Sequence, residues 1–470
     1  MGAGSAGLVL HTGVMATSDR TRLFADLVGE RHVIVDDDLT LRATRDWTGR
    51  WGPNPAIVVR PGSTDEVSAV VAACADGAIP VVPQGGNTGL TGSSVPPEPG
   101  WVVLSTERLG TLGALDVVEG RIVVGAGVTL SSLATHISAT RWRYGVDFGA
   151  RDRATIGGSI ATNAGGMWVF RHGTTRHQIV GIEAVLGDGS VISHLGGLGK
   201  DNTGYDLAAL LCGSEGTLGV VTAASLRLID GPPDRCTALL GFSDISAAAN
   251  VAWGLRGGLP ELEVAELLGP GCTRLVAAHV QGPDSMAGSP VSLLVETAGD
   301  DGSELGERLR QALESLHFEG ASAVATDHAT RAALWRFRDG ITDALAATGP
   351  VLKFDVSIPA TDLAQFCHEV GDLIGSQDRG AAVWVFGHVC DHNVHVNVTG
   401  LDPRVNPDVE DAVLGRVAEL GGSISAEHGI GRSRRRHLSL VRTAAEIAAM
   451  RAVKRALDPA GILNPGVIFD

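Results

Sequence analysis

A glycine-rich loop near residue 85 sets the strongest limit on the fold of this chain. The loop covers residues 83–94, and four glycines fall within the eight positions 85–92. Threonine and serine hydroxyls stand between them, and the Gly-Lys-Ser/Thr ending of a P-loop is missing. Such a loop can bring a row of backbone N–H groups close to a pyrophosphate without added positive charge. An ordinary long turn is the alternative for this loop taken alone.

Two further glycine-rich segments follow, at residues 149–166 and 212–219. Glycine accounts for 63 of the 470 residues, while hydrophobic residues account for 44%, which excludes a wholly disordered chain. The excess glycine is therefore expected in turns and in loops that approach a ligand. Three such segments in one region indicate a single long ligand, and a flavin dinucleotide has that length.

The pattern of elements predicts an α+β layout. A β-branched run at 56–59, a helix at 64–75 and a strand at 79–82 precede the first loop. Short strands then alternate with glycine-rich turns until Gly231-Pro232-Pro233, which predicts a domain boundary. A final helix is expected from Thr443 to Leu457.

Composition excludes several classes of function. The formal net charge is −16, and the longest basic run, Arg434-Arg435-Arg436, is interpreted as a solvated loop, so nucleic acid is disfavoured as a partner. No stretch approaches the roughly 18 apolar residues that span a bilayer. The six cysteines are scattered, which favours reduced thiols and a cytoplasmic location. The Gly2–Gly7 fingerprint follows no strand, so we do not expect it to bind a nucleotide.

A polar cluster is expected in the second half of the chain. His395 and Asn397 alternate with valines and therefore share one face of a strand, and His388 ends the preceding strand. Glu427, in a glycine-rich turn, can add a carboxylate. Two imidazoles and one carboxylate suit Zn²⁺, and Mn²⁺ or Fe²⁺ would also fit. From the residues alone, buried core histidines are an equal alternative, and His392 is expected to point away.

A second group of residues could bind an anion. Arg338 and Thr342 are four apart on one predicted helix face, and Lys353 lies on the strand that follows. Together they could bind a carboxylate, with Arg338 in a bidentate manner. Surface salt bridges are the favoured alternative when only these residues are considered.

Four motifs in order resemble those of one family: PxGGxTGLTG, TIGGxIATNAGG, KDNTGYDL and GSEGTLGVVT. Together they are similar to the FAD-binding domain of the vanillyl-alcohol-oxidase/p-cresol-methylhydroxylase superfamily, in the branch of D-2-hydroxyglutarate, D-lactate and glycolate dehydrogenases. The resemblance covers about residues 45–470. It implies a two-subdomain flavin-binding domain of the p-cresol-methylhydroxylase type and an α+β cap domain with an antiparallel sheet. The implied organisation is an N-terminal extension at 1–20, an FAD-binding domain at 21–230, a cap domain with the metal site at 231–442, and a segment at 443–470 that returns to the FAD domain.

The resemblance also implies a role for each site residue. The segment GHVCDHNVHVN matches a family motif whose glycines are replaced here by Cys390 and His392, which could reshape the turn. Neither His nor Cys occurs in 83–95, where Asn87 stands in place of a linking residue, so we expect non-covalent FAD. The FAD-binding residues are expected to be Gln84, Gly85, Gly86, Asn87, Thr88, Gly89, Leu90, Gly149, Thr155, Gly158, Ser159, Asn163, Gly216, Val221 and Asn464. The metal ligands would be His388, His395 and Glu427; Arg338, Thr342, Lys353 and Asn397 would bind substrate; and His428 would be the general base.

These residues together predict a dehydrogenase that oxidises a D-2-hydroxy acid, with hydride transfer to flavin N5. D-2-hydroxyglutarate is the favoured substrate because two cationic groups suit two carboxylates. D-lactate or glycolate, a non-catalytic FAD-binding subunit and a zinc hydrolase are the alternatives. The electron acceptor (a quinone, a cytochrome, an electron-transfer flavoprotein or oxygen) and the oligomeric state, a homodimer included, are left open by the sequence.

Overall fold

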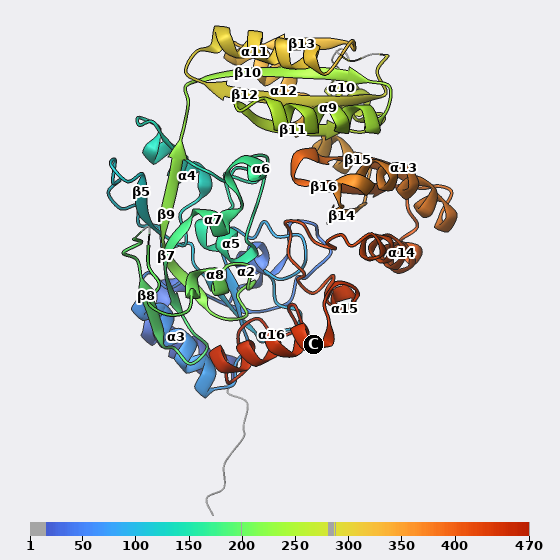
Figure 1. Ribbon diagram of the computed structural model, residues 1–470. Helices are drawn as coiled ribbons and strands as arrows, with labels where there is room; N and C mark the ends of the chain where they lie inside the picture. Colours follow the sequence, from blue (N-terminus) through green and yellow to red (C-terminus); the bar gives the residue numbers. More distant parts are fainter. Residues whose placement is uncertain (1–15, 199, 281–285, 287, 470) are drawn as a thin grey trace, which may run out of the picture.

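The expected strand–helix–strand pattern after residue 56 forms as β2 (Ile57–Val59), α3 (Thr64–Asp76) and β3 (Val81–Gln84). It is seen in the computed structural model, which describes residues 16–198, 200–280, 286 and 288–469 (Figure 1). The Ser63 hydroxyl caps α3 by accepting a hydrogen bond from the Glu66 N–H at 3.2 Å. The Gly2–Gly7 fingerprint lies outside the described residues.

The first sheet brings the glycine-rich loop to the end of a buried strand. Its order is β1-β2-β4-β3, with β2, β4 and β3 parallel and β1 antiparallel to β2. The loop leaves the carboxyl end of β3, a common place for ligand loops in parallel sheets. The remaining elements around this sheet are α1 (Thr17–Val28), β1 (Val33–Ile34), α2 (Asp37–Thr44) and β4 (Val102–Ser105). Helix α1 thus begins inside the segment 1–20 that we expected to be an extension.

The second sheet belongs to the same lobe and shares its apolar core with the first. Its strands run antiparallel in the order β5-β9-β7-β8, and β6 pairs with β9. The strands are β5 (Arg121–Gly125), β6 (Trp142–Tyr144), β7 (Ile179–Val185), β8 (Val191–His194) and β9 (Val220–Asp230). The helices are α4 (Leu130–Ile137), α5 (Ile156–Thr162), α6 (Val169–His172), α7 (Thr175–Gln178) and α8 (Leu207–Leu211).

The third sheet forms the second lobe, which we call the cap. It is antiparallel throughout, in the order β13-β10-β12-β11-β15-β16-β14, so the prediction of an antiparallel cap sheet is confirmed. The strands are β10 (Asp234–Phe242), β11 (Leu262–Leu268), β12 (Val291–Gly299), β13 (Ser322–Ala325), β14 (Val351–Ser357), β15 (Ala382–His388) and β16 (Asn393–Thr399).

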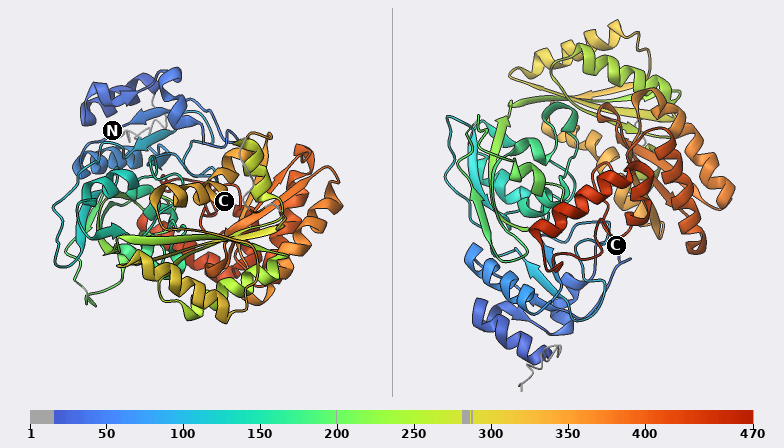
Figure 2. Two further views of the ribbon diagram at one scale, coloured as in Figure 1. Left: turned by 90° about the horizontal axis from the view of Figure 1, so that it is seen from above. Right: turned by 60° about the horizontal axis from the view of Figure 1, so that its bottom comes forward.

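Helices cover both faces of the cap sheet (Figures 1 and 2). One face packs against α9 (Ile245–Gly258), α11 (Gly302–Ser315), α13 (Ala360–Gln377) and α14 (Asn406–Glu419). The other packs against α10 (Cys272–His279) and α12 (His328–Ala346). Met167 and Trp168 of the first lobe pack against the apolar residues of α10 and α12. Helix α12 therefore lies on the side of the cap that faces the first lobe.

The chain ends back in the first lobe. After α15 (Leu438–Val441), helix α16 (Ala444–Leu457) lies beside that lobe, as Figure 2 shows. The Val81 N–H donates to the Ile462 carbonyl at 2.8 Å, and the Asn464 N–H donates to the Val81 carbonyl at 2.7 Å. The segment after α16 is therefore hydrogen-bonded to β3. Within the described residues, no helix combines the length and apolar character needed to cross a membrane.

Candidate active site

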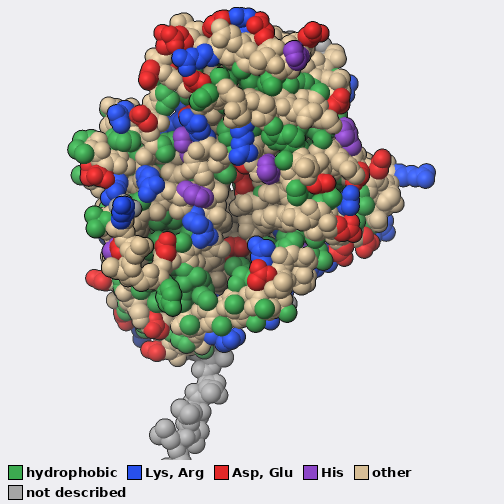
Figure 3. Space-filling model, in the orientation of Figure 1, with side chains coloured by type: hydrophobic (Ala, Val, Ile, Leu, Met, Phe, Trp, Pro, Cys, Tyr) green, Lys and Arg blue, Asp and Glu red, His purple; other side chains and the backbone are tan. Residues whose placement is uncertain are grey.

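A cavity of about 890 Å³ lies between the two lobes. One side is formed by the loop after β3 and by glycine-rich residues at 149–166 and 214–221. The other side is formed by α12 and by the strands β14, β15 and β16 of the cap. Figure 3 shows a hollow in the middle of this face, with Lys, Arg and His side chains gathered around it. The three glycine-rich segments and the histidine cluster thus meet at one cavity.

The wall formed by the first lobe presents its backbone. The N–H groups of Gly86 to Leu90 donate no hydrogen bond to any residue that the structure describes. A Cβ at Gly85 or Gly86 would lie closer than 3.0 Å to the Thr155 hydroxyl or the Arg153 carbonyl, so only glycine lets these two loops close on each other. Ser159 adds a buried Oγ that has no partner among the described atoms. Free N–H donors beside an unpartnered hydroxyl fit the pyrophosphate of FAD.

Most of the predicted FAD-binding residues line this wall, and three need comment. Asn163 ends α5 in a left-handed conformation and accepts a hydrogen bond from the Arg176 N–H, outside the cavity lining. Asn464 is buried and donates to the carbonyls of Ser93 and Glu215, so it joins loops of the lobe and does not reach the cavity. Asn87 lines the cavity, but its amide donates to the α2 carbonyl of Arg42 and to Arg45.

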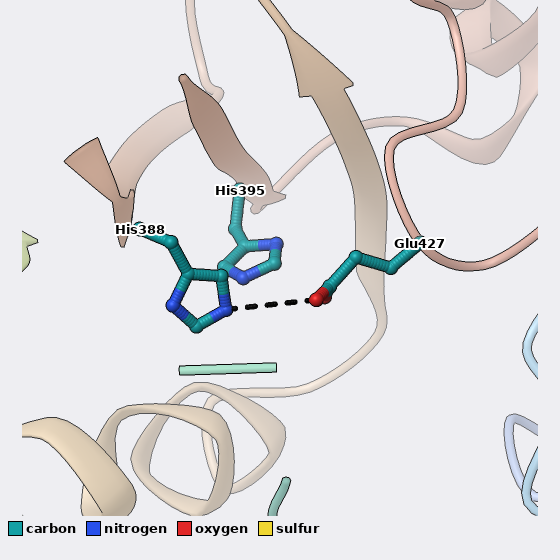
Figure 4. Close-up of side chains that lie close together, drawn as sticks. All are labelled: His388, His395 and Glu427. Atoms are coloured by element: carbon teal, nitrogen blue, oxygen red, sulfur yellow. Dashed lines mark ion pairs between the residues drawn. The ribbon is translucent and has the colours of Figure 1, made fainter. Parts of the chain in front are cut away.

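The wall formed by the cap presents side chains, and strand register brings them together. His388 on β15 lies opposite Glu266 on β11, and His395 on β16 lies opposite Asp355 on β14. A short turn, residues 389–391, joins the two histidine-bearing strands. Glu427 arrives from the loop after α14, which runs beside the end of β14. Figure 4 shows His388, His395 and Glu427 pointing toward one another.

The three predicted metal ligands form a compact group. Their ligand atoms all lie within 4.8 Å of one another, and His388 Nε2 is 3.8 Å from Glu427 Oε1. His388 Nδ1 is hydrogen-bonded to the buried Glu266 carboxylate, so Nε2 is the nitrogen that faces Glu427. A ligating imidazole usually makes this second bond to a carboxylate. The donor set therefore fits a divalent cation with an open position for substrate.

The electrostatics of the group favour a positive charge at this point. Burial alone would lower the pKa of His388, but the Glu266 carboxylate raises it to about 9. Burial raises the pKa of Glu427, whereas burial lowers the pKa of His395 to about 4, which leaves that ring neutral with a free lone pair. A proton on His388, or a metal cation beside it, would balance the negative charge of the Glu266 carboxylate.

Asp355 lies behind the group and is fully buried. Its Oδ2 accepts hydrogen bonds from the N–H groups of Glu427 at 2.7 Å and His428 at 3.0 Å. Although burial alone would raise the pKa of Asp355, the neighbouring His428 and His395 rings hold it well below its usual value. His428 itself lines the cavity, and its Nδ1 lies 3.4 Å from Asp355 Oδ2.

The predicted anion-binding residues also line the cavity, together with Asn397. Arg338 is ion-paired through Nε to Glu266, and its guanidinium lies 5.0 Å from the centre of the Phe386 ring. Its two Nη groups make no hydrogen bond to any residue that the structure describes. Lys353 Nζ makes no hydrogen bond in the described part of the chain and lies 5.0 Å from the centre of the Trp47 ring. Burial lowers the pKa of Lys353, and Asp343 opposes this. Thr342 lies one helical turn after Arg338 on α12.

Sequence reasoning missed Glu266, Trp47 and the central position of Asp355. Glu266 carries no motif; its role depends on the pairing of β11 with β15. Asp355 is two residues after Lys353 on the predicted strand and therefore shares its face, which is a signal that the sequence does carry. The interpretation of Arg434-Arg435-Arg436 as a solvated loop was wrong for Arg434, which is buried. Its Nη1 donates to the Asp355 and Ile424 carbonyls at 3.2 and 2.8 Å, and these bonds offset the cost of burying its charge.

Comparison with known proteins gives two family matches. Residues 55–194 match the model described as an FAD binding domain, and residues 231–468 match the C-terminal domain of FAD linked oxidases. A D-2-hydroxyglutarate dehydrogenase of Xanthomonas citri pv. viticola is 38% identical over 438 residues, which is 91% of this chain and 92% of that protein. The mitochondrial D-2-hydroxyglutarate dehydrogenase of Danio rerio is 35% identical over 440 residues, covering 92% of this chain and 82% of the relative.

The solved structure of p-cresol methylhydroxylase with substrate bound has the same fold. Its TM-score is 0.76 at 16% identity, over 96% of each chain. The fold class expected from the sequence, a p-cresol-methylhydroxylase-type flavin domain with an α+β cap, is therefore confirmed.

Proposed function

Because the chain belongs to the FAD-linked oxidases of the vanillyl-alcohol-oxidase/p-cresol-methylhydroxylase superfamily and is an FAD-dependent 2-hydroxy-acid dehydrogenase, we propose that it oxidises D-2-hydroxyglutarate to the 2-oxo acid. The observation that carries the proposal is the shared cavity, which joins the glycine-rich wall to the cap cluster. The named relatives support the choice of acid. On the cap side of the cavity, the two cationic side chains Arg338 and Lys353 support a substrate with two carboxylates.

The two cationic groups have different surroundings and are assigned different carboxylates. Glu266 pairs with both Arg338 and His388 and therefore holds Arg338 near the proposed metal ligands. The Nη groups of Arg338 bind the carboxylate adjacent to the reacting carbon. Lys353 stands beside Trp47 and binds the distal carboxylate. Thr342 and Asn397 add a hydroxyl and an amide to the same wall.

The cap residues also determine where the proton goes. A divalent cation, best Zn²⁺, held by His388, His395 and Glu427 would supply Lewis acidity toward the substrate oxygens. His428 has Nδ1 turned toward Asp355, so Nε2 takes the proton of the substrate hydroxyl as general base. When bound, FAD supplies the acceptor for the hydride from C2. The residues of the first wall, from Gln84 to Leu90 and from Gly216 to Val221, hold the FAD without a covalent link.

A panel of acids with an artificial dye as electron acceptor tests the proposal. We expect the purified, FAD-loaded chain to have its highest kcat/KM with D-2-hydroxyglutarate, below it D-lactate and glycolate, and no turnover of the L-enantiomer. Lys353→Met should lower kcat/KM for D-2-hydroxyglutarate at least about tenfold more than for D-lactate, because D-lactate has no distal carboxylate. Equal losses, or a preference of the unaltered chain for D-lactate, would overturn the assignment of substrate.

The metal role has its own test. His388→Ala and Glu427→Gln should abolish turnover while the flavin absorbance of the purified protein stays unchanged, because neither residue belongs to the glycine-rich wall. An unaffected rate in either variant would refute this role.

We also propose a cytoplasmic location for the protein. All six cysteines are free and buried thiols, which is the form expected in a reducing cytoplasm.

A further inference from the structure

Asp355 contacts Glu427, His428 and His395 of the proposed machinery, although it does not line the cavity. It belongs to β14, whereas the groups around it come from β16 and from the loop after α14. Its side chain is fully buried. A buried charge of this kind is costly unless several donors satisfy it.

Each oxygen of Asp355 serves a different segment. Oδ2 accepts from the two consecutive N–H groups of Glu427 and His428, at 2.7 and 3.0 Å, and this fixes the turn that carries both side chains. Oδ1 accepts from the Asn393 amide at 2.8 Å. His395 Nδ1 is 3.5 Å from Oδ1 and His428 Nδ1 is 3.4 Å from Oδ2.

The two imidazoles are consequently held in parallel. The rings of His395 and His428 have centroids 6.3 Å apart and an interplanar angle of 14°. Both rings have Nδ1 beside the Asp355 carboxylate, so both Nε2 atoms remain able to bind a metal or accept a proton. An imidazole with Nδ1–H directed at a carboxylate has its tautomer fixed, so Nε2 carries the lone pair.

We infer that Asp355 is a positioning residue that sets the proposed metal ligands His395 and Glu427 and the proposed base His428 at once. The inference rests on the proposed function of this cluster. This role requires an acceptor, because the groups that face the two Asp355 oxygens are donors: two backbone N–H groups, the Asn393 amide and two imidazole Nδ1 atoms. In Asp355→Asn the side chain has nearly the same size, but its NH₂ group would face a backbone N–H or an imidazole N–H.

The test compares Asp355→Asn with a matched control, Asp458→Asn. Asp458 is also a buried aspartate that accepts two backbone N–H bonds, from Ile462 at 3.1 Å and Leu463 at 2.8 Å, but it lies in the C-terminal segment outside the cavity lining. Co²⁺ alone, followed by its absorbance, is the metal probe, and flavin absorbance reports FAD content. We expect Asp355→Asn to keep FAD, to weaken Co²⁺ binding at least about tenfold and to lower kcat at least as much. Asp458→Asn should leave Co²⁺ affinity and kcat per bound FAD unchanged.

A double-variant cycle separates positioning from mere loss of stability. If Asp355 acts on turnover through His428, Asp355→Asn should lower kcat much less in the His428→Gln background than in the unaltered chain. Equal losses in both backgrounds, or Co²⁺ affinity equal to that of the unaltered chain, would overturn the inference. A failure to turn over any 2-hydroxy acid would overturn the proposed function instead, and it would leave the Co²⁺ comparison intact.

Asn393→Ala provides a milder variant if Asp355→Asn does not fold. It removes one hydrogen bond to Oδ1 and keeps the carboxylate, so it should weaken Co²⁺ binding several-fold with full FAD content. Unchanged Co²⁺ affinity in Asn393→Ala would also overturn the inference.

Discussion

The wall of the cavity that follows β3 presents backbone N–H groups, whereas the wall formed by β14, β15 and β16 presents side chains that buried carboxylates hold in place. The first wall needs glycine at fixed points, because the loops around Gly86 and Arg153 close on each other without room for a Cβ. The second needs Glu266 and Asp355, which stand on strands far from the histidines in sequence. Binding by backbone is therefore a local property of the chain, while the cluster is a property of sheet register.

The largest effect should come from breaking the backbone wall. In Gly86→Ala the new Cβ would overlap the Arg153 carbonyl, so the two loops must separate and the N–H groups of the first loop must move. We expect FAD content, measured as flavin absorbance per protein, to fall below about a tenth of that of the unaltered chain. Co²⁺ binding by the cap should persist. Gly110→Ala, where a Cβ would meet open space, is the control and should retain FAD. Full FAD content in Gly86→Ala would show that close packing of these loops is not required.

The next largest effect should come from the cap wall. Arg338→Gln removes both free Nη donors and leaves Glu266 with His388 as its remaining charged partner. Since hydrogen bonds to charged groups contribute about 1.5–3 kcal/mol each, loss of the two donors should raise KM at least about 100-fold with FAD content unchanged. Arg336→Gln, an exposed arginine on the same helix that does not line the cavity, should leave KM as it is. A rise in KM for both variants would indicate a general electrostatic effect of α12.

A third test concerns the contact between the lobes. Glu263 on β11 is ion-paired with Arg143 on β6, and Arg235 lies 3.0 Å from its second oxygen. Burial would raise the pKa of Glu263, but the hydrogen bond from His172 and the charges of Arg143 and Arg235 lower it from 4.5 to about 2. A carboxyl whose pKa is lower in the folded state stabilises that state above the unfolded pKa, and this stabilisation is lost as the pH falls toward the folded pKa.

The expected size follows from that shift. The difference in the free energy of unfolding between the unaltered chain and Glu263→Gln should shrink by about 2 kcal/mol between about pH 7 and about pH 3. Urea unfolding at the two pH values measures it. Glu419→Gln, whose carboxylate is exposed, should show a change of no more than a few tenths of a kcal/mol. A pH-independent difference for Glu263→Gln would contradict the role of this charge.

The same contrast explains how far the sequence could predict the structure. Glycine spacing, strand alternation and the turn at 389–391 are local, so the loop at 83–94 and the shared face of His395 and Asn397 could be predicted. Glu266 could not, because nothing within β11 shows that β15 will lie beside it. The resemblance implies that Asn464 contacts FAD, but its buried amide donates to the Ser93 and Glu215 carbonyls. Pairing between distant strands decides such roles, and a sequence does not display it.

The smallest effect concerns the turn where Cys390 and His392 stand in place of glycines. His392 has φ of 70°, the left-handed region that favours glycine, so it keeps the turn at the cost of backbone strain between its Cβ and the following carbonyl. Cys390 is buried, with Sγ 3.5 Å from the Ala252 carbonyl, which packs the turn onto α9. The turn therefore needs no glycine to place His388 and His395.

His392→Gly should consequently stabilise the protein by up to about 1 kcal/mol, because relief of left-handed strain outweighs the entropy that glycine adds to the unfolded chain. Turnover and Co²⁺ affinity should not change. Ala78→Gly is the counterpart in the first lobe, since Ala78 is also left-handed, with φ of 47°. A similar gain in both variants, measured by urea unfolding, would show that this strain is local in either lobe. A loss of Co²⁺ affinity confined to His392→Gly would instead show that the His392 side chain helps to shape the cluster, and the division between a backbone wall and a wall set by buried carboxylates would need a third contributor at this turn.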